Sequence, residues 1–121
     1  MGSLDVLGGL DDSAGYKAPC ACATIVDLTS AMIGLPEIDG YQTESGDRVL
    51  VWKNADTTTN GIYTASLSAW SRALDFTNSS AILAGTQVLV FNGAAYGGKT
   101  FICQTQNPIV GATAITFLQH S

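Results

Sequence analysis

The residues of this sequence with the most chemical potential are one histidine, three cysteines and ten acids. His120 precedes the last residue, where a catalytic base is difficult to hold rigidly, so a triad-type hydrolase is not expected. Cys20 and Cys22 have the spacing of half a zinc site, but Cys103 and His120 do not supply a second close ligand pair. Because residues two apart share one face of a strand, we expect Cys20 and Cys22 to be small packed side chains.

The acids do not form an obvious catalytic pair. Backbone hydrogen bonding in turns explains four of them, namely Asp39, Glu44, Asp47 and Asp56. Three others stand less clearly in turns, namely Asp27, Glu37 and Asp75. Hydrolysis of a glycoside needs two carboxyl groups whose environments separate their pKa values. Of the functions considered for this sequence, an enzyme that cleaves polysaccharide therefore has the least support.

Two segments contain residue types found in ligand-binding loops, but neither has the full pattern of such a loop. Asp11 and Asp12 lack the spaced acids of a calcium loop. Residues 93–98 read GAAYGG, but they lack the lysine and the following helix of a phosphate-binding loop. The sequence therefore assigns no catalytic residue, no metal ligand and no cofactor.

Four aromatic residues would stack against sugars if they were exposed, namely Trp52, Tyr63, Trp70 and Tyr96. Trp52 and Tyr63 lie on the two arms of an expected hairpin, so we expect them to form a cross-strand or interlayer pair. Tyr96 lies in a glycine-rich turn and is expected to be exposed. Tyr96 and Trp70 are the candidate contacts for a glycan.

The composition favours a β-sheet protein as the scaffold for these residues. Of 121 residues, 46% are hydrophobic and only 12% are charged. Surface helices normally carry many Lys and Glu residues, whereas neutral polar residues suit strands and turns. The net charge of −5 opposes phosphate neutralisation, so no nucleic-acid partner is expected.

Short apolar or alternating runs, separated by turn residues, continue from residue 16 to the end. They predict an all-β fold, a compact sandwich or small barrel of about seven or eight short antiparallel strands. An irregular connection at 74–85 is expected to hold one helical turn around 80–83. The turns include Asp39–Gly40, and the strands are expected at 22–28, 35–41, 48–53, 62–66, 69–73, 86–91, 99–104 and 114–119.

Residues 1–15 match neither the helical nor the strand period, and we expect an extended arm before a single β domain at 16–121. The arm is expected to place its apolar side chains on a neighbouring subunit, and these are Leu4, Val6, Leu7 and Leu10. The alternative is that it packs on its own domain. No apolar run is long enough for membrane insertion, and no signal peptide is expected. An odd number of cysteines argues against a disulfide framework and for synthesis in a reducing cytoplasm.

An ordered set of short motifs runs through most of the chain. The motifs are KAP at 17–19 with AT at 23–24, IDG at 38–40, GDRVLV at 46–51, NGIY at 60–63, WSRA at 70–73 with Asp75, and the strands at 85–91, 100–103 and 114–117. In this order they resemble a small β domain of bacteriophage and prophage tail-fibre and related virion proteins. The sequence departs from that pattern in its CAC entry and in the lack of flanking fibre repeats, so we expect a separate virion part.

The resemblance implies a non-enzymatic structural protein that is synthesised in the cytoplasm of the host bacterium. It is expected in the virion as a tail, fibre-attachment or adaptor, or capsid decoration component. Its expected partners are copies of itself, in a trimer or a larger ring, and other virion proteins. The alternative from another class is a receptor-binding module that recognises host cell-surface glycans through exposed aromatic residues.

Overall fold

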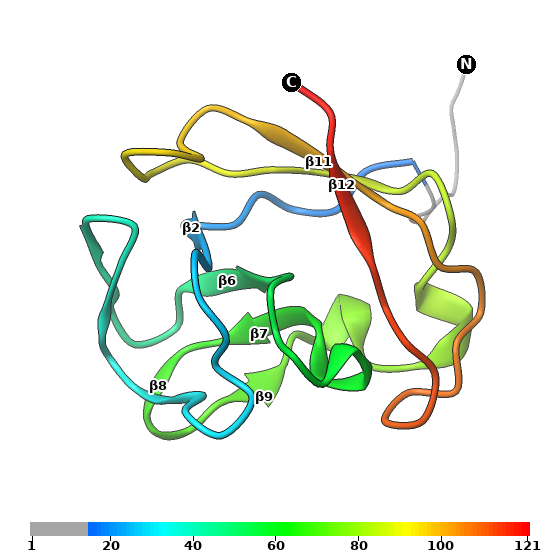
Figure 1. Cartoon of the computed structure of the whole chain (residues 1–121), viewed down its shortest axis with the longest axis horizontal. Coiled ribbons are helices and arrows are strands. Elements are labelled where there is room, and N and C mark those ends of the chain that lie inside the picture. Colours follow the sequence, from blue (N-terminus) through cyan, green and yellow to red (C-terminus); the bar gives the residue numbers. More distant parts are fainter. Residues whose placement is uncertain (1–14) are drawn as a thin grey trace.

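The computed structural model describes residues 15–121, which form an all-β fold of short strands (Figure 1). Residues 1–14 lie outside the described residues, and with them Leu4, Val6, Leu7 and Leu10. Helical structure in the described part is limited to three 3₁₀ turns of three residues each. Within the same part of the chain, no helix has the length and hydrophobicity that crossing a membrane requires.

A four-stranded sheet forms the centre of the molecule. Its strands are β2 (Cys22–Ala23), β6 (Arg48–Val51), β7 (Gly61–Thr64) and β9 (Ser71–Arg72), in that spatial order. The β6–β7 and β7–β9 pairs are antiparallel, as expected, but β2 runs parallel to β6. The strands are thus not all antiparallel, because the entry segment lies along β6 without a hairpin connection.

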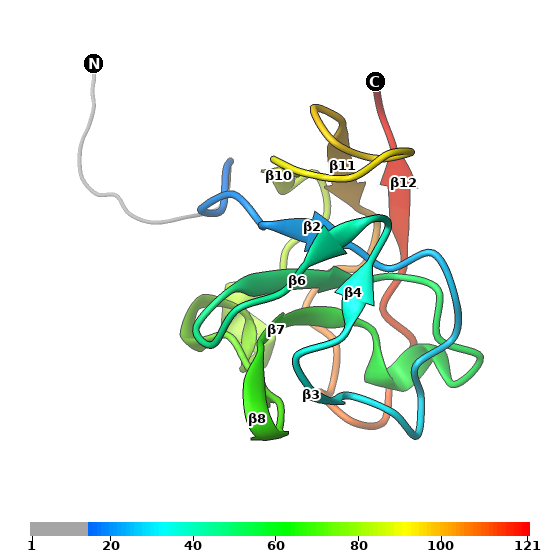
Figure 2. The same ribbon diagram turned by 90° about the vertical axis from the view of Figure 1, so that its left-hand side faces the viewer.

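A three-stranded antiparallel sheet lies above the central sheet in Figure 1, and Figure 2 shows the same layers from the side. It contains β10 (Gln87–Leu89), β11 (Thr100–Cys103) and β12 (Phe117–Gln119) in that order. The entry segment runs along the far side of β10, where two isolated parallel bridges join Tyr16 to Gln87 and Cys20 to Val90.

Two small pairs of strands complete the sheets. β4 (Glu37–Ile38) and β5 (Tyr41–Gln42) form a hairpin, and Asp39–Gly40 is its turn, as predicted. β3 (Ile33–Gly34) pairs with β8 (Ser66–Ala69), a pairing that the sequence did not predict.

Most predicted strands are confirmed, with shorter bounds than expected. The structure has eleven named strands over residues 15–121. The expected strand at 22–28 ends after Ala23, because Asp27 closes a local turn by accepting hydrogen bonds from the Thr29 amide and hydroxyl groups. The expected helical turn around 80–83 is found one residue earlier, as η4 (Ser79–Ala81). The other turns are η2 (Thr57–Thr59) and η3 (Leu74–Phe76).

The central sheet is covered on both faces, because its strands alternate between two apolar clusters. Leu50 and Ile62 point into the larger cluster, toward the three-stranded sheet. Val49, Val51 and Tyr63 point into the smaller cluster on the opposite face. A strand buried on both sides shows a continuous apolar run, and this accounts for the RVLV sequence of β6.

The two clusters overturn two expected pairings. Trp52 packs against the larger cluster, whereas Tyr63 belongs to the smaller one, opposite Val49, so they do not face each other. Cys20 and Cys22 are both buried, as expected, but Cys20 points into the larger cluster and Cys22 into the smaller one. The entry segment passes from β10 to β6 between them, so these two residues do not share a face.

Candidate functional site

The chain reverses at Asp39 and Gly40, between β4 and β5. Both residues have positive φ, +53° at Asp39 and +80° at Gly40. A two-residue hairpin of this kind requires the left-handed conformation at both central positions, which Asp tolerates and glycine adopts freely. The turn therefore fixes the direction of the Asp39 side chain, which is buried.

The Asp39 carboxylate holds the loop at 92–98, which connects β10 to β11. It accepts hydrogen bonds from the Ala95 amide, at 3.0 and 3.1 Å to its two oxygens, and from the Tyr96 amide at 3.0 Å. The Asp39 carbonyl accepts a further bond from the Ala94 amide. A Cβ atom at Gly93 would collide with the carboxylate, so glycine is needed there. One residue thus anchors three consecutive amide groups of the loop, two through its carboxylate and one through its carbonyl oxygen.

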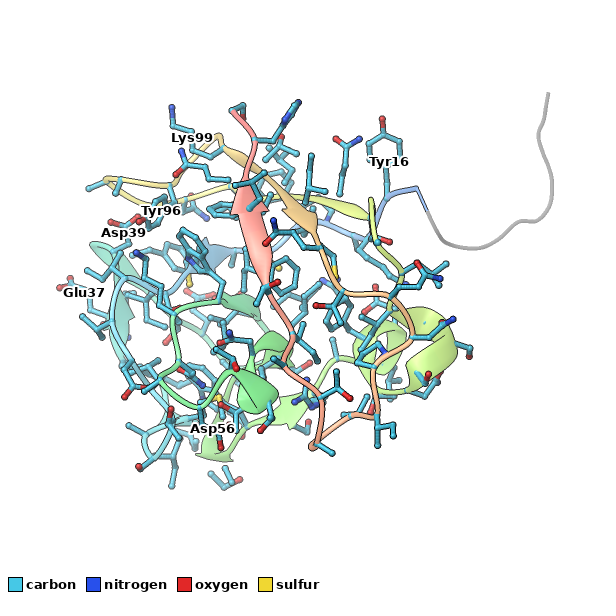
Figure 3. The ribbon with its side chains drawn as sticks, turned by 45° about the vertical axis from the view of Figure 1, so that its right-hand side comes forward. Tyr16, Glu37, Asp39, Asp56, Tyr96 and Lys99 are labelled. Atoms are coloured by element: carbon cyan, nitrogen blue, oxygen red, sulfur yellow. The ribbon has the colours of Figure 1, made fainter. Side chains whose placement is uncertain are left out.

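Tyr96 is half-buried, which differs from the exposed position expected for it. Its ring lies edge-on to Trp52, with centroids 5.4 Å apart, and to Phe101 at 5.7 Å. Asp39, which is labelled next to Tyr96 in Figure 3, accepts a hydrogen bond from the Tyr96 amide, and the ring of Tyr96 packs against the larger cluster. The glycine-rich sequence predicted a flexible loop at Tyr96, but the hydrogen bonds to the Asp39 carboxylate restrict the loop backbone.

One charged group lies beside these rings. The Lys53 ammonium group is 4.6 Å from the centre of the Trp52 ring and 5.9 Å from that of Tyr96. A hollow of about 280 Å³ with a mixed polar and apolar lining adjoins the loop, and it is lined by Asp39, Gly40, Tyr41, Asn92, Gly93 and Ala94. Two partly exposed aromatic rings with a cation beside them can contact a sugar.

Trp70 does not offer a sugar platform in this structure. Its side chain is only 7% exposed and belongs to the smaller cluster. Its indole N–H donates a hydrogen bond to the Gly34 carbonyl oxygen at 2.8 Å, which ties β9 to the β3–β8 pair. Trp70 is therefore a core residue, and this corrects its place among the candidate ligand contacts.

A second hollow, of about 140 Å³, is mainly apolar. Asp39 belongs to its lining as well, together with the apolar residues Ile25, Val26, Leu28, Pro36 and Ile38. Glu37 and Asp39 are the two acids in this lining, and Asp39 accepts the hydrogen bonds from the loop described above.

The other acids and the thiols considered for chemistry have structural contacts. Asp75 forms a two-pronged ion pair with Arg48, at 2.8 and 3.1 Å. Burial raises the pKa of the Cys20 and Cys22 thiols to about 12. Burial also raises the pKa of Cys103. The described residues contain no group of three or more potential metal ligands.

The sequence did not predict an exposed apolar surface on β10, β11 and β12, which we call the outer face of the three-stranded sheet. Val88, Phe101, Cys103 and Phe117 point inward, so the alternate residues point outward. One row of paired residues crosses the sheet as Tyr16, Gln87, Ile102 and Leu118. Tyr16 is 75% exposed, and both it and Lys99 lie on the upper side of the molecule in Figure 3.

Further apolar side chains extend this row. Leu118 and Phe91 are 53% and 61% exposed, and Leu89 is exposed to a smaller extent. The sequence did contain a signal for this surface. A strand with one solvent-exposed face normally alternates apolar and polar residues, whereas these strands carry apolar residues at both the inward and the outward positions. An exposed group of large apolar side chains on one sheet is typical of a protein interaction surface.

Comparisons of the chain with protein-family models, with curated proteins and with solved structures found no match.

Proposed function

We propose that this protein is a non-enzymatic structural component of a bacteriophage virion, in the tail, at a fibre attachment or adaptor, or as a capsid decoration. It acts by binding copies of itself and other virion proteins. The observation that carries the assembly role is the apolar outer face of the three-stranded sheet, with Tyr16, Phe91 and Leu118 exposed. The virion role rests on the ordered motifs of the sequence.

The structure of the motifs agrees with a rigid building block. The GDRVLV motif is the doubly covered strand β6, and the IDG motif provides the Asp39 anchor of a distant loop. The motif arginines hold segments in place, since Arg48 binds Asp75 and Arg72 donates to the carbonyl oxygens of Asn60 and Thr58. These contacts stabilise a shape and leave the outer surfaces to provide function.

The size of the purified full-length protein tests this proposal, together with its binding to phage particles. Light scattering across a range of concentrations should show a trimer or a larger ring, and the protein should sediment with particles that lack it. A protein that stays monomeric at high concentration and does not bind particles would refute the proposal.

A second candidate is glycan binding at the Tyr96 loop, favoured by the position of Lys53 over Trp52 and Tyr96. Replacing Lys53 with Ala removes the cation without opening the core, because Lys53 is exposed. Loss of binding to host cells in K53A and in Tyr96→Ala, with binding retained in a Lys99→Ala control, supports a receptor-binding module. Equal binding by all three variants excludes it.

A further inference from the structure

The outer face of the three-stranded sheet is apolar and exposed, and its strands carry no acidic residues. From residue 76 to the end the sequence has no Asp or Glu, and its ionisable side chains of basic type are Lys99 and His120. Seven acids lie elsewhere in residues 15–121, and none of them is in the three strands of this sheet or in the segments that connect those strands. An apolar surface without acids favours an apolar partner that carries negative charge.

The N-terminal segment of this chain has that composition. Residues 1–14 contain Leu4, Val6, Leu7 and Leu10, three aspartates, and no Lys or Arg. The segment joins the described fold at Gly15 and Tyr16, and Tyr16 is itself the first member of the exposed row across the sheet. The apolar segment therefore enters the molecule at the border of the apolar face.

The segment is also long enough to reach a neighbouring molecule. Fourteen extended residues span up to about 46 Å at roughly 3.3 Å per residue. Three strands and the bridged entry segment extend only about 15–20 Å across a sheet at roughly 4.8 Å per strand. The segment can thus leave its own molecule and still cover the whole face of the next one.

We propose that the outer face of the three-stranded sheet is the acceptor for the N-terminal segment of a second copy of this chain, with Leu4, Val6 and Leu7 covering Leu89, Phe91 and Leu118. This assignment rests on the proposed assembly function, and it identifies the two surfaces that join. Each copy gives a segment and receives one, so the contact is head-to-tail and closes into a ring when the rotation between copies permits.

Cysteine cross-linking between two single variants tests the proposal. One preparation carries Val6→Cys and the other Leu118→Cys, and the two are mixed and oxidised mildly. The native thiols remain silent because Cys20, Cys22 and Cys103 are buried. Docking raises the local concentration of the two new thiols to the millimolar range, so their disulfide should form on the order of 100-fold faster than between undocked thiols.

A matched control uses Leu67→Cys as the acceptor. Leu67 is 80% exposed on β8, which both ribbon views place at the opposite end of the molecule from β11 and β12 (Figures 1 and 2). A covalent pair between V6C and L118C chains, with none between V6C and L67C chains, supports the proposal.

Other outcomes overturn the assignment in distinguishable ways. If only the double variant V6C/L118C forms a disulfide, within one monomeric chain, the segment covers its own sheet. If no disulfide forms in an oligomer that still assembles, the acceptor is elsewhere and the proposed assembly function stands. If the protein is monomeric and does not bind particles, both proposals fail.

Discussion

The two large sheets of this molecule differ in how many of their faces are covered. Apolar clusters pack against both faces of the central sheet, β2–β6–β7–β9. The three-stranded sheet, β10–β11–β12, is packed on its inner face only, and within residues 15–121 its outer face carries exposed leucine and aromatic side chains. Similar apolar composition therefore has two roles, since the first sheet stabilises the fold and the second leaves a surface for contact.

Replacing one leucine in each sheet should give the largest contrast. Leu50 is fully buried between the two sheets, so Leu50→Ala is expected to lower the free energy of unfolding by about 2–5 kcal/mol. Leu118→Ala, on the outer face, should change it by less than about 0.5 kcal/mol in the monomer. Urea unfolding of both variants measures the difference, and similar losses would show that the outer face is part of the core.

The anchor between the hairpin and the three-stranded sheet should have an intermediate effect. Asp39→Ala removes the acceptor of the Ala95 and Tyr96 amides and places a less tolerant residue at positive φ. We expect a loss of about 1–3 kcal/mol in unfolding free energy. Asp39→Asn keeps one acceptor oxygen and the left-handed preference, so it is the matched control with a smaller loss.

Faster amide hydrogen exchange confined to the 92–98 loop in the alanine variant would confirm that the carboxylate holds it. Exchange rates in this loop that do not change would contradict the assigned role of Asp39.

The smallest effect is expected at Asp27, an exposed residue outside both sheets. Hydrogen bonds from the Thr29 hydroxyl, from the Ala55 amide and from the Thr29 amide lower its pKa from the ordinary value of 3.8. A carboxyl group with a lowered folded-state pKa stabilises the fold above pH 3.8, and that stabilisation is lost as the pH falls through the lowered value.

The Asp27→Asn variant does not titrate at this position. Urea unfolding at several pH values measures the difference in unfolding free energy between this variant and the wild type. The difference should be present near neutral pH, and it should disappear as the pH falls from 3.8 through the lowered pKa. A difference independent of pH would exclude the carboxylate as its cause.

The local features of this fold were predictable because they depend on neighbouring residues. The RVLV run predicted β6, the Asp39–Gly40 pair predicted a turn, and Asp56 was expected in the turn that it forms with Thr58. The all-β class followed from composition and from the short spacing of apolar runs.

The sequence did not reveal the contacts between distant segments. Asp39 meets the 94–96 amides only because a turn with positive φ aims its carboxylate there, and nothing in the spacing of these residues shows it. Trp70 and Tyr96 are both aromatic residues near turn sequences, yet the first is buried and the second half-buried, because different clusters receive them. The outer face was missed because an alternating pattern with apolar residues in both registers does not show which register is open.

The parallel bridges of the entry segment have a consequence for the order in which the protein forms. Tyr16 and Cys20 are among the first described residues to leave a ribosome, but their partners Gln87 and Val90 belong to β10, which is made much later. Long-range pairings of this kind slow folding, because the intervening chain must be brought together first. The two sheets therefore cannot be joined during early synthesis, and chains that stop before β10 are expected to be substrates for proteases.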